Sequence, residues 1–125
     1  MNNLSTATPL DLATTMVEIL NEKNAGDLRL LHVTDQTIIA DYFIICTGNS
    51  NTQIKAFAGE LEFKLGEYGV KPLRTEGFSE ASWIVMDFAS VIVHIFNRET
   101  REFYNLERLW GDSVEVDVSG IVTEK

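Results

Sequence analysis

Apolar residues in the first part of the chain recur every three to four positions, a spacing that predicts an amphipathic helix. The Thr8-Pro9 pair marks its start, because threonine is a good N-cap and proline suits the first helical position. Gly26 lies beyond the end of the pattern. The apolar stripe consists of Leu12, Ala13, Met16, Val17 and Leu20.

Two β-strands are predicted next, from Leu28 to Val33 and, after a turn at residues 34–37, up to about Thr47. The second strand contains a continuous apolar run, Phe43-Ile44-Ile45-Cys46, rather than an alternation. Because neither face of such a strand is polar, we expect a central strand that is covered on both sides.

The following segment predicts a second amphipathic helix. It opens with the capping-box pattern Ser50-Asn51-Thr52-Gln53, and Gly69 supplies its end. Between them, apolar residues follow at helical spacing: Ile54, Phe57, Ala58, Leu61, Leu65 and Tyr68.

A short strand at Lys71–Thr75 precedes two longer strands, Trp83–Phe88 and Val91–Phe96, and a final helix spans about Arg98 to Trp110. The order α-β-β-α-β-β-β-α predicts an α/β fold, with helices packed on a mixed β-sheet. We expect a single domain over residues 1–111.

Residues 112–125 are predicted to form a flexible tail. Val114, Val116 and Val118 alternate with polar residues, so an edge strand is the alternative. We favour the tail, since chain ends fray unless they are tied down.

The charge balance of the 125-residue chain restricts its partners. Ten Lys and Arg residues stand against 19 Asp and Glu residues, a net charge of −9. Phosphate backbones and anionic lipids repel such a chain, so we expect little or no direct nucleic-acid binding and no membrane binding. A basic protein surface is the partner that this charge favours, although the charge can equally serve solubility alone.

Cys46 is the only cysteine, which excludes an intrachain disulfide and a thiolate metal cage. A chain without disulfides fits a reducing compartment. The N-terminus lacks the charged and apolar regions of a signal peptide, and no apolar run is long enough to cross a bilayer. We therefore expect a cytoplasmic protein.

The loop Thr47-Gly48-Asn49-Ser50 joins a predicted strand to a predicted helix, a place where phosphates often bind. The Lys of a P-loop and the second Gly of a nucleophile elbow are both missing. We favour a structural role over an anion site: Gly48 permits the turn, while Ser50 and Asn51 cap the helix.

A loop of this kind on a mixed sheet is also similar to nucleotidyltransferases, which need paired carboxylates for their metal ions. Glu60 and Glu62 match that sequence pattern. On a helix, however, residues two apart point about 200° away from each other, so these two cannot share an ion. We expect a nucleotidyltransferase-like fold without catalytic carboxylates, and hence no enzyme, no cofactor and no metal site.

The histidines and the cysteine fit structural roles. His32 alternates within its strand, and His94 shares one strand face with Ile92 and Phe96, which predicts a core histidine. Cys46 lies inside an apolar run and is expected to be a buried, inert thiol. These residues form no catalytic grouping.

A series of short motifs extends in order from the second predicted strand to the last predicted helix. They are Ala40-Asp41-Tyr42-Phe43, Thr47-Gly48-Asn49-Ser50 with Gln53, Pro72-Leu73, Glu76-Gly77, Trp83-Ile84-Val85-Met86-Asp87, Val91-Ile92-Val93-His94-Ile95-Phe96, Arg101, Phe103-Tyr104 and Leu106-Glu107-Arg108-Leu109-Trp110. Each motif is weak alone, but the ordered set is specific. The chain resembles the ribosomal silencing factor family (RsfS), also called the Iojap or YbeB-like family, from the first helix to the end of the last motif.

The resemblance implies a nucleotidyltransferase-like fold without catalytic acids. It also implies binding to the large ribosomal subunit through its fourteenth protein, which lies at the subunit interface. A factor bound there blocks the small subunit and represses translation when nutrients are short. Family members are also similar in forming homodimers. A role in large-subunit biogenesis is one alternative, and a residual nucleotide-binding transferase is another.

The resemblance places the family's binding surface on Trp83, which we expect to be a partly exposed aromatic anchor. We extend the surface to Asp87, Glu76 and Tyr104. Each has a structural alternative: Trp83 could close one end of the sheet, Asp87 could be an ordinary sheet residue, Glu76 could brace its loop, and Tyr104 could be a core residue.

One turn departs from the family pattern. Ala89-Ser90 stands where the family usually has Gly-Asp. If that aspartate contributes a salt bridge to the ribosomal protein, this chain lacks it.

Overall fold

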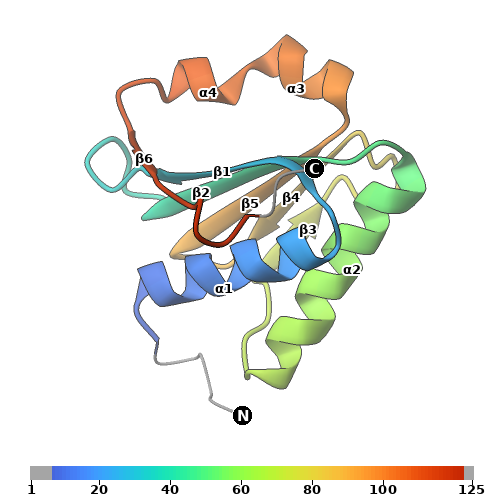
Figure 1. Ribbon diagram of the computed structural model, residues 1–125, viewed down its shortest axis with the longest axis horizontal. Helices are drawn as coiled ribbons and strands as arrows, with labels where there is room; N and C mark the ends of the chain where they lie inside the picture. The colour runs from blue at the N-terminus through green and yellow to red at the C-terminus, as the bar shows by residue number, and fades with distance from the viewer. Residues whose placement is uncertain (1–6, 123–125) are drawn as a thin grey trace.

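A mixed sheet of six strands forms the centre of the protein, in a computed structural model that describes residues 7–122 (Figure 1). This range leaves out residues 1–6, which the expectation about the N-terminus concerns, and residues 123–125, which end the expected tail. The elements are α1 (Pro9–Glu22), β1 (Gly26–His32), β2 (Tyr42–Thr47), α2 (Asn51–Glu67), β3 (Arg74–Glu76), β4 (Trp83–Asp87), β5 (Val91–Phe96), α3 (Arg98–Tyr104), α4 (Leu106–Leu109) and β6 (Val114–Val116).

The strands lie in the order β3-β4-β5-β2-β1-β6. β2 and β5 are parallel, and every other neighbouring pair is antiparallel. The continuous apolar strand β2 is therefore central, and Ile44, Ile45 and Cys46 are fully buried. Both the α/β fold and the central position of this strand are confirmed.

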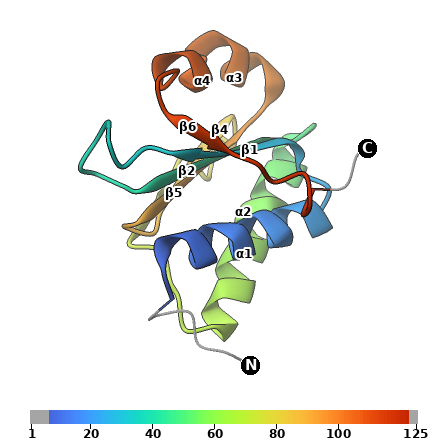
Figure 2. The same ribbon diagram turned by 60° about the vertical axis from the view of Figure 1, so that its left-hand side comes forward.

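Helices cover the two faces of the sheet in separate pairs. α1 and α2 pack on one face, whereas α3 and α4 pack on the other, and Figures 1 and 2 agree on this division. The first face carries the larger core, where Met16, Leu20, Phe57 and Leu61 meet strand residues such as Ile84. A smaller second core, built around Phe43, Ile92, Phe96 and Leu106, lies under α3 and α4.

The predicted helix caps are present. The Thr8 hydroxyl accepts from the Asp11 amide at 3.1 Å, and the Ser50 hydroxyl accepts from the Gln53 amide at 3.0 Å. The Gln53 side chain accepts from the Asn49 amide, one residue before the N-cap, so the arrangement is a variant of the capping box. Asn51 is the first residue of α2 rather than a second cap.

The final helix is not continuous, in contrast to the prediction. Asn105 adopts a left-handed conformation, with φ 49° and ψ 59°, and separates α3 from α4. Asparagine accepts this conformation more readily than most residues, because its short side chain tolerates positive φ. The break turns the Leu106 side chain into the second core and leaves Phe103 exposed, although residues three apart would lie on one side of a continuous helix.

The expectation of a flexible tail was wrong for Val114–Val116, which form the edge strand β6 against β1. Leu30 lies opposite Val116, and Arg29 forms an ion pair with Glu115 at 3.2 Å. Val116 and Val118 are partly buried against the larger core, whereas Val114 is exposed. β6 thus covers the edge of β1, whose backbone groups would otherwise be unpaired along Leu30, Leu31 and His32.

Candidate docking face

The second face of the sheet is only partly covered, and its open part lies over β3 and β4. Residues of β4 alternate: Ile84 and Met86 are buried in the larger core, while Trp83, Val85 and Asp87 stay half-buried on the opposite side. We call the surface formed by Glu76, Trp83, Val85, Asp87 and Tyr104 the docking face. It contains the four residues that the sequence analysis singled out.

Trp83 lies at the centre of this face, between sheet and helix. Its ring stacks on Phe96, with centroids 4.9 Å apart, and it lies 4.8 Å from the ring of Tyr104. The indole N–H donates to Nδ1 of His94 at 3.1 Å. The indole thus closes one end of the second core with one side and is half-buried, as expected for an anchor at a surface.

α3 brings Tyr104 to the docking face, although it is 21 positions along the chain from Trp83. Tyr104 is 51% exposed, and the neighbouring Phe103, 80% exposed, meets it edge to face at 5.0 Å. Leu109 is 71% exposed on α4. Sequence analysis missed Phe103 and Leu109 as surface residues, since a continuous helix would have turned Phe103 inward.

Asp87 and Glu76 give the face two carboxylates. Asp87 accepts a hydrogen bond from the Ala89 amide at 2.8 Å and lies 3.5 Å from Nε of Arg74. Ala89 has φ 71°, so the carboxylate stabilises a turn whose backbone suits glycine better than alanine. Glu76 is an exposed residue of the edge strand β3, opposite Val85, and not part of the loop as predicted.

His94 and Cys46 are buried, as predicted. Burial lowers the pKa of His94 from 6.5 to about 4, because a charged imidazole is poorly solvated there. Burial also raises the pKa of the Cys46 thiol from 9.0 to about 12, although the positive charge of Arg101 acts in the opposite direction. A thiol with this pKa is not a nucleophile near neutral pH.

The lowered pKa of His94 predicts a pH dependence of stability. Between pH 6.5 and pH 4 the unfolded chain binds a proton at His94 that the folded protein does not, so the free energy of unfolding falls as the pH falls. Urea titrations of the wild type and of His94→Phe at several pH values check this. We expect a smaller loss over this interval in the variant, and equal losses in both proteins would contradict the assignment.

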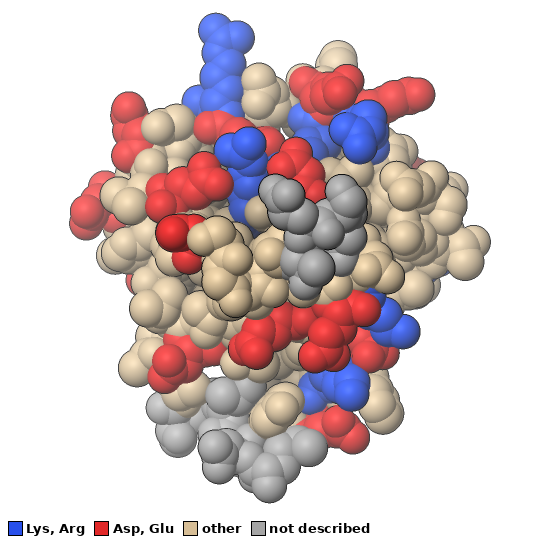
Figure 3. All heavy atoms as spheres, in the orientation of Figure 1, with Lys and Arg blue, Asp and Glu red and all other residues tan. Residues whose placement is uncertain are grey.

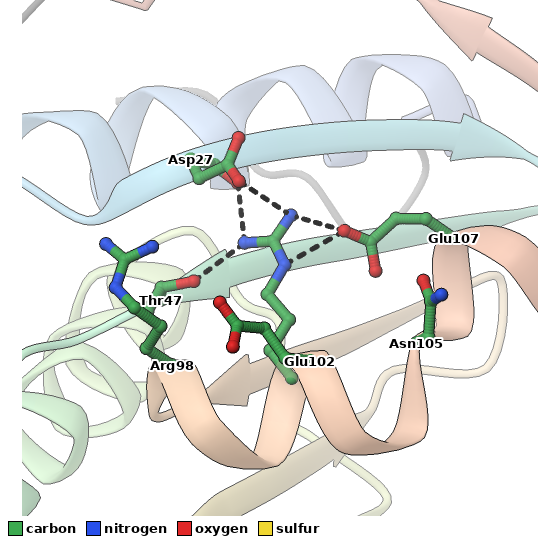
Figure 4. A pocket seen from close by; sticks show the side chains of 7 residues that line it. Asp27, Thr47, Arg98, Glu102, Asn105 and Glu107 are labelled. Atoms are coloured by element: carbon green, nitrogen blue, oxygen red, sulfur yellow. Dashed lines mark hydrogen bonds and ion pairs between the residues drawn. The ribbon is translucent and has the colours of Figure 1, made fainter.

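A second feature is a hollow of about 230 Å³ at the carboxyl end of β2, with Asp27, Thr47 and Glu107 around it (Figure 4). Arg101, which is buried, donates from Nη1 to the Asp27 carbonyl at 2.8 Å and to the Thr47 hydroxyl at 2.7 Å. Its Nε donates to Glu107 at 3.0 Å, and its Nη2 forms ion pairs with Glu107 at 2.9 Å and with Asp27 at 3.5 Å.

Nε and Nη1 of Arg101 therefore donate hydrogen bonds within the protein, while Nη2 is held by ion pairs alone and has no hydrogen-bond partner among the described residues. This arrangement braces α3 and α4 against β1 and β2 rather than presenting a free cation to a ligand. The sequence analysis quoted Arg101 only as part of a motif, and nothing in the local sequence indicates partners more than 50 positions away.

The two glutamates that match a nucleotidyltransferase pattern both lie on α2. Glu60 is half-buried and Glu62 is exposed on α2, two positions apart on one helix. Across the described part of the chain, no group of three or more His, Cys, Asp and Glu side chains could hold a metal ion. Within residues 7–122, no helix has the length and hydropathy needed to cross a membrane.

Acidic side chains are spread over the face seen in Figure 3, and most of the basic side chains in that view lie beside acidic ones. Arg29 illustrates this pairing, since it contacts both Asp27 and Glu115. On this face the acidic side chains are thus spread over the surface rather than gathered in one cluster.

Comparisons with known proteins match this chain to a single family. The family model described as "Ribosomal silencing factor during starvation" (RsfS) matches residues 6–125. The ribosomal silencing factor RsfS of Bacillus subtilis is 41% identical over 98 residues, which cover 78% of this chain and 83% of the relative. "Mitochondrial assembly of ribosomal large subunit protein 1" of Mus musculus is 33% identical over 98 residues, 76% of this chain and 43% of that protein. The crystal structure of protein CV0518 from Chromobacterium violaceum has a TM-score of 0.81 at 29% identity and covers 91% of this chain and 95% of the other.

Proposed function

Because this chain belongs to the ribosomal silencing factor (RsfS) family, we propose that it is a translational repressor that acts by occupying a surface of the large ribosomal subunit. The fourteenth protein of that subunit is the proposed contact, and the small subunit is then excluded by steric overlap when nutrients are limiting. The proposal includes no catalytic step. The observation that carries it is the half-open docking face with Trp83 at its centre.

The shape and chemistry of the docking face support a protein partner. Trp83 and Tyr104 offer adjacent aromatic surface, and such residues dominate the energetics of many interfaces. Asp87 and Glu76 add negative charge at the same place. Because ribosomal RNA is a polyanion, it repels a chain with a net charge of −9, whereas a basic ribosomal protein attracts it.

Replacing Trp83 by alanine is expected to weaken binding to purified large subunits by about 2 kcal/mol or more, since the indole is the largest apolar group on the docking face. Phe63→Ala is the matched control: Phe63 is 63% exposed, but it lies on α2, which covers the opposite face of the sheet. Co-sedimentation over a range of subunit concentrations measures both. A folded Trp83→Ala variant with full affinity would remove Trp83 from the site.

The repressor activity itself has a separate readout. Added protein should lower the yield of joined ribosomes when small and large subunits are mixed, and sucrose-gradient profiles measure that yield. The same gradients should show the protein in the large-subunit fraction. Binding without any change in joining would leave attachment intact but contradict steric exclusion.

Assistance in large-subunit biogenesis is the second candidate, supported by the name of the mouse relative. Both functions predict the same contact, so binding measurements do not separate them. Comparison of large-subunit precursors in cells with and without the factor does. Accumulated precursors would favour biogenesis, whereas normal precursors with excess joined ribosomes during starvation would favour repression.

The free protein is further proposed to be a cytoplasmic homodimer with little direct affinity for nucleic acid. Light scattering tests the dimer, and titration of ribosomal RNA fragments tests the affinity. The Ala89-Ser90 turn lacks the aspartate usual in the family, so a salt bridge from that position is not part of the proposal.

A further inference from the structure

His94 lies directly behind the docking face. It occupies the strand position opposite Val85 and points to the same side of the sheet as Trp83. Its ring is buried among aromatic rings: Phe43 at 5.0 Å, Trp83 at 6.0 Å and Phe96 at 6.2 Å between centroids. A polar side chain in this position is unusual, because the surrounding groups are apolar.

The hydrogen bond to Trp83 fixes the state of the imidazole. An indole N–H can only donate, so Nδ1 of His94 must offer its lone pair, and the neutral ring carries its proton on Nε2. Nε2 is buried and has no hydrogen-bond partner among the described residues. A buried donor without a partner is unfavourable for folding, so an apolar residue would suit this core position better if stability were its only purpose.

We propose that His94 is a positioning residue of the docking face: its Nδ1 holds the Trp83 indole in the orientation that the ribosomal protein meets. This inference rests on the proposed function. Stacking on Phe96 restrains the plane of the indole, but a stacked ring can still turn within that plane. The directional bond from the indole N–H to Nδ1 removes this freedom, so less conformational entropy is lost on docking.

The low pKa of His94 is compatible with this role. Since burial holds the pKa at about 4, the imidazole is neutral and remains an acceptor throughout the physiological pH range. The rings packed against it, from β2, β4 and β5, belong to Phe43, Trp83 and Phe96 and carry no charge. We therefore expect the acceptor role of His94 to be unchanged by pH near neutrality.

The test compares two substitutions at one position. His94→Phe keeps the ring but removes the acceptor, whereas His94→Asn can place an amide oxygen where Nδ1 was. With purified large subunits as the probe, we expect His94→Phe to bind about three- to tenfold more weakly, the size expected when one side chain has to be ordered on docking, without loss of stability toward urea. His94→Asn should recover affinity despite lower stability. Opposite effects on binding and stability are not expected from a merely structural residue.

A second readout does not depend on the ribosome. The chain has two tryptophans, so two indole cross-peaks are expected in a ¹H–¹⁵N spectrum, and Trp110→Phe assigns them. In His94→Phe the Trp83 cross-peak should shift upfield in the proton dimension, and its indole proton should exchange faster. If His94→Phe does not fold, His94→Leu replaces it in both measurements.

The outcomes separate the two proposals. The proposed docking face would be overturned if Trp83→Ala and His94→Phe both kept full affinity, or if the wild type did not bind. In either case the indole cross-peak still reports whether His94 holds the ring. Weak binding of Trp83→Ala together with wild-type affinity of His94→Phe would overturn the role of His94 alone. An unchanged Trp83 cross-peak in His94→Phe would overturn it as well.

Discussion

Replacement of Arg101 by methionine is expected to lower the free energy of unfolding by about 3 to 5 kcal/mol, the range typical for removing one partner of a buried ion pair. The guanidinium donates to the buried Thr47 hydroxyl, the Asp27 carbonyl and Oε2 of Glu107 at the same time. Methionine fills a similar volume but leaves these acceptors without their donor. α3 and α4 would also lose their main polar attachment to β1 and β2.

Urea unfolding followed by circular dichroism measures the effect. Arg98→Met is the matched control, because Arg98 lines the same hollow from the same helix but is exposed, and we expect a change below about 0.5 kcal/mol. Adding Glu107→Leu to Arg101→Met should restore part of the loss, since it removes the carboxylate left without a partner. A loss below about 1 kcal/mol in Arg101→Met would contradict the brace.

Replacement of Gly77 by alanine should cost about 3 kcal/mol and weaken docking as well. Gly77 has φ 81°, a region that alanine adopts only with strain. A Cβ atom at this position would lie 2.1 Å from the carbonyl oxygen of Trp83, a contact that only a shift of the backbone can relieve. Because that carbonyl belongs to the first residue of β4, the shift would also move the anchor of the docking face.

Gly59→Ala is the control for this substitution. Gly59 lies within α2, and a Cβ there would meet nothing within 4 Å. Alanine is the better helix former, so Gly59→Ala should raise the free energy of unfolding by about 0.5 to 1 kcal/mol. Parallel urea titrations and large-subunit binding assays measure both variants. Equal stabilities of Gly77→Ala and Gly59→Ala would contradict the close approach at Gly77.

The docking face was predictable only in part. The motif Trp83-Ile84-Val85-Met86-Asp87 reads as an alternating strand, which places Trp83 and Asp87 on one side of the sheet, and the structure has them there. The bond between Trp83 and His94 depends on the register of β4 against β5, which an antiparallel pattern alone does not fix. The contact between Trp83 and Tyr104 depends further on where α3 ends.

The boundaries of the last elements show why tertiary context mattered at the C-terminal end. The helical pattern continues through Asn105, so periodicity predicted one helix where the chain forms two. Val114–Val116 is too short to form a strand alone and becomes one by pairing with the free edge of β1. Neither the second core that receives Leu106 nor that edge is visible in a local window of sequence.

The sequence by itself determined the α/β class, the central apolar strand, the capped first two helices and the acidic character that favours a basic protein partner. These features depend on local spacing, local hydrogen bonds and composition, all of which are readable without coordinates. Only the tertiary structure decided the buried partners of Arg101, the bond from His94 to Trp83, and the exposure of Phe103. Each of these joins residues from different elements, and such contacts are set by strand register and helix packing rather than by neighbours along the chain.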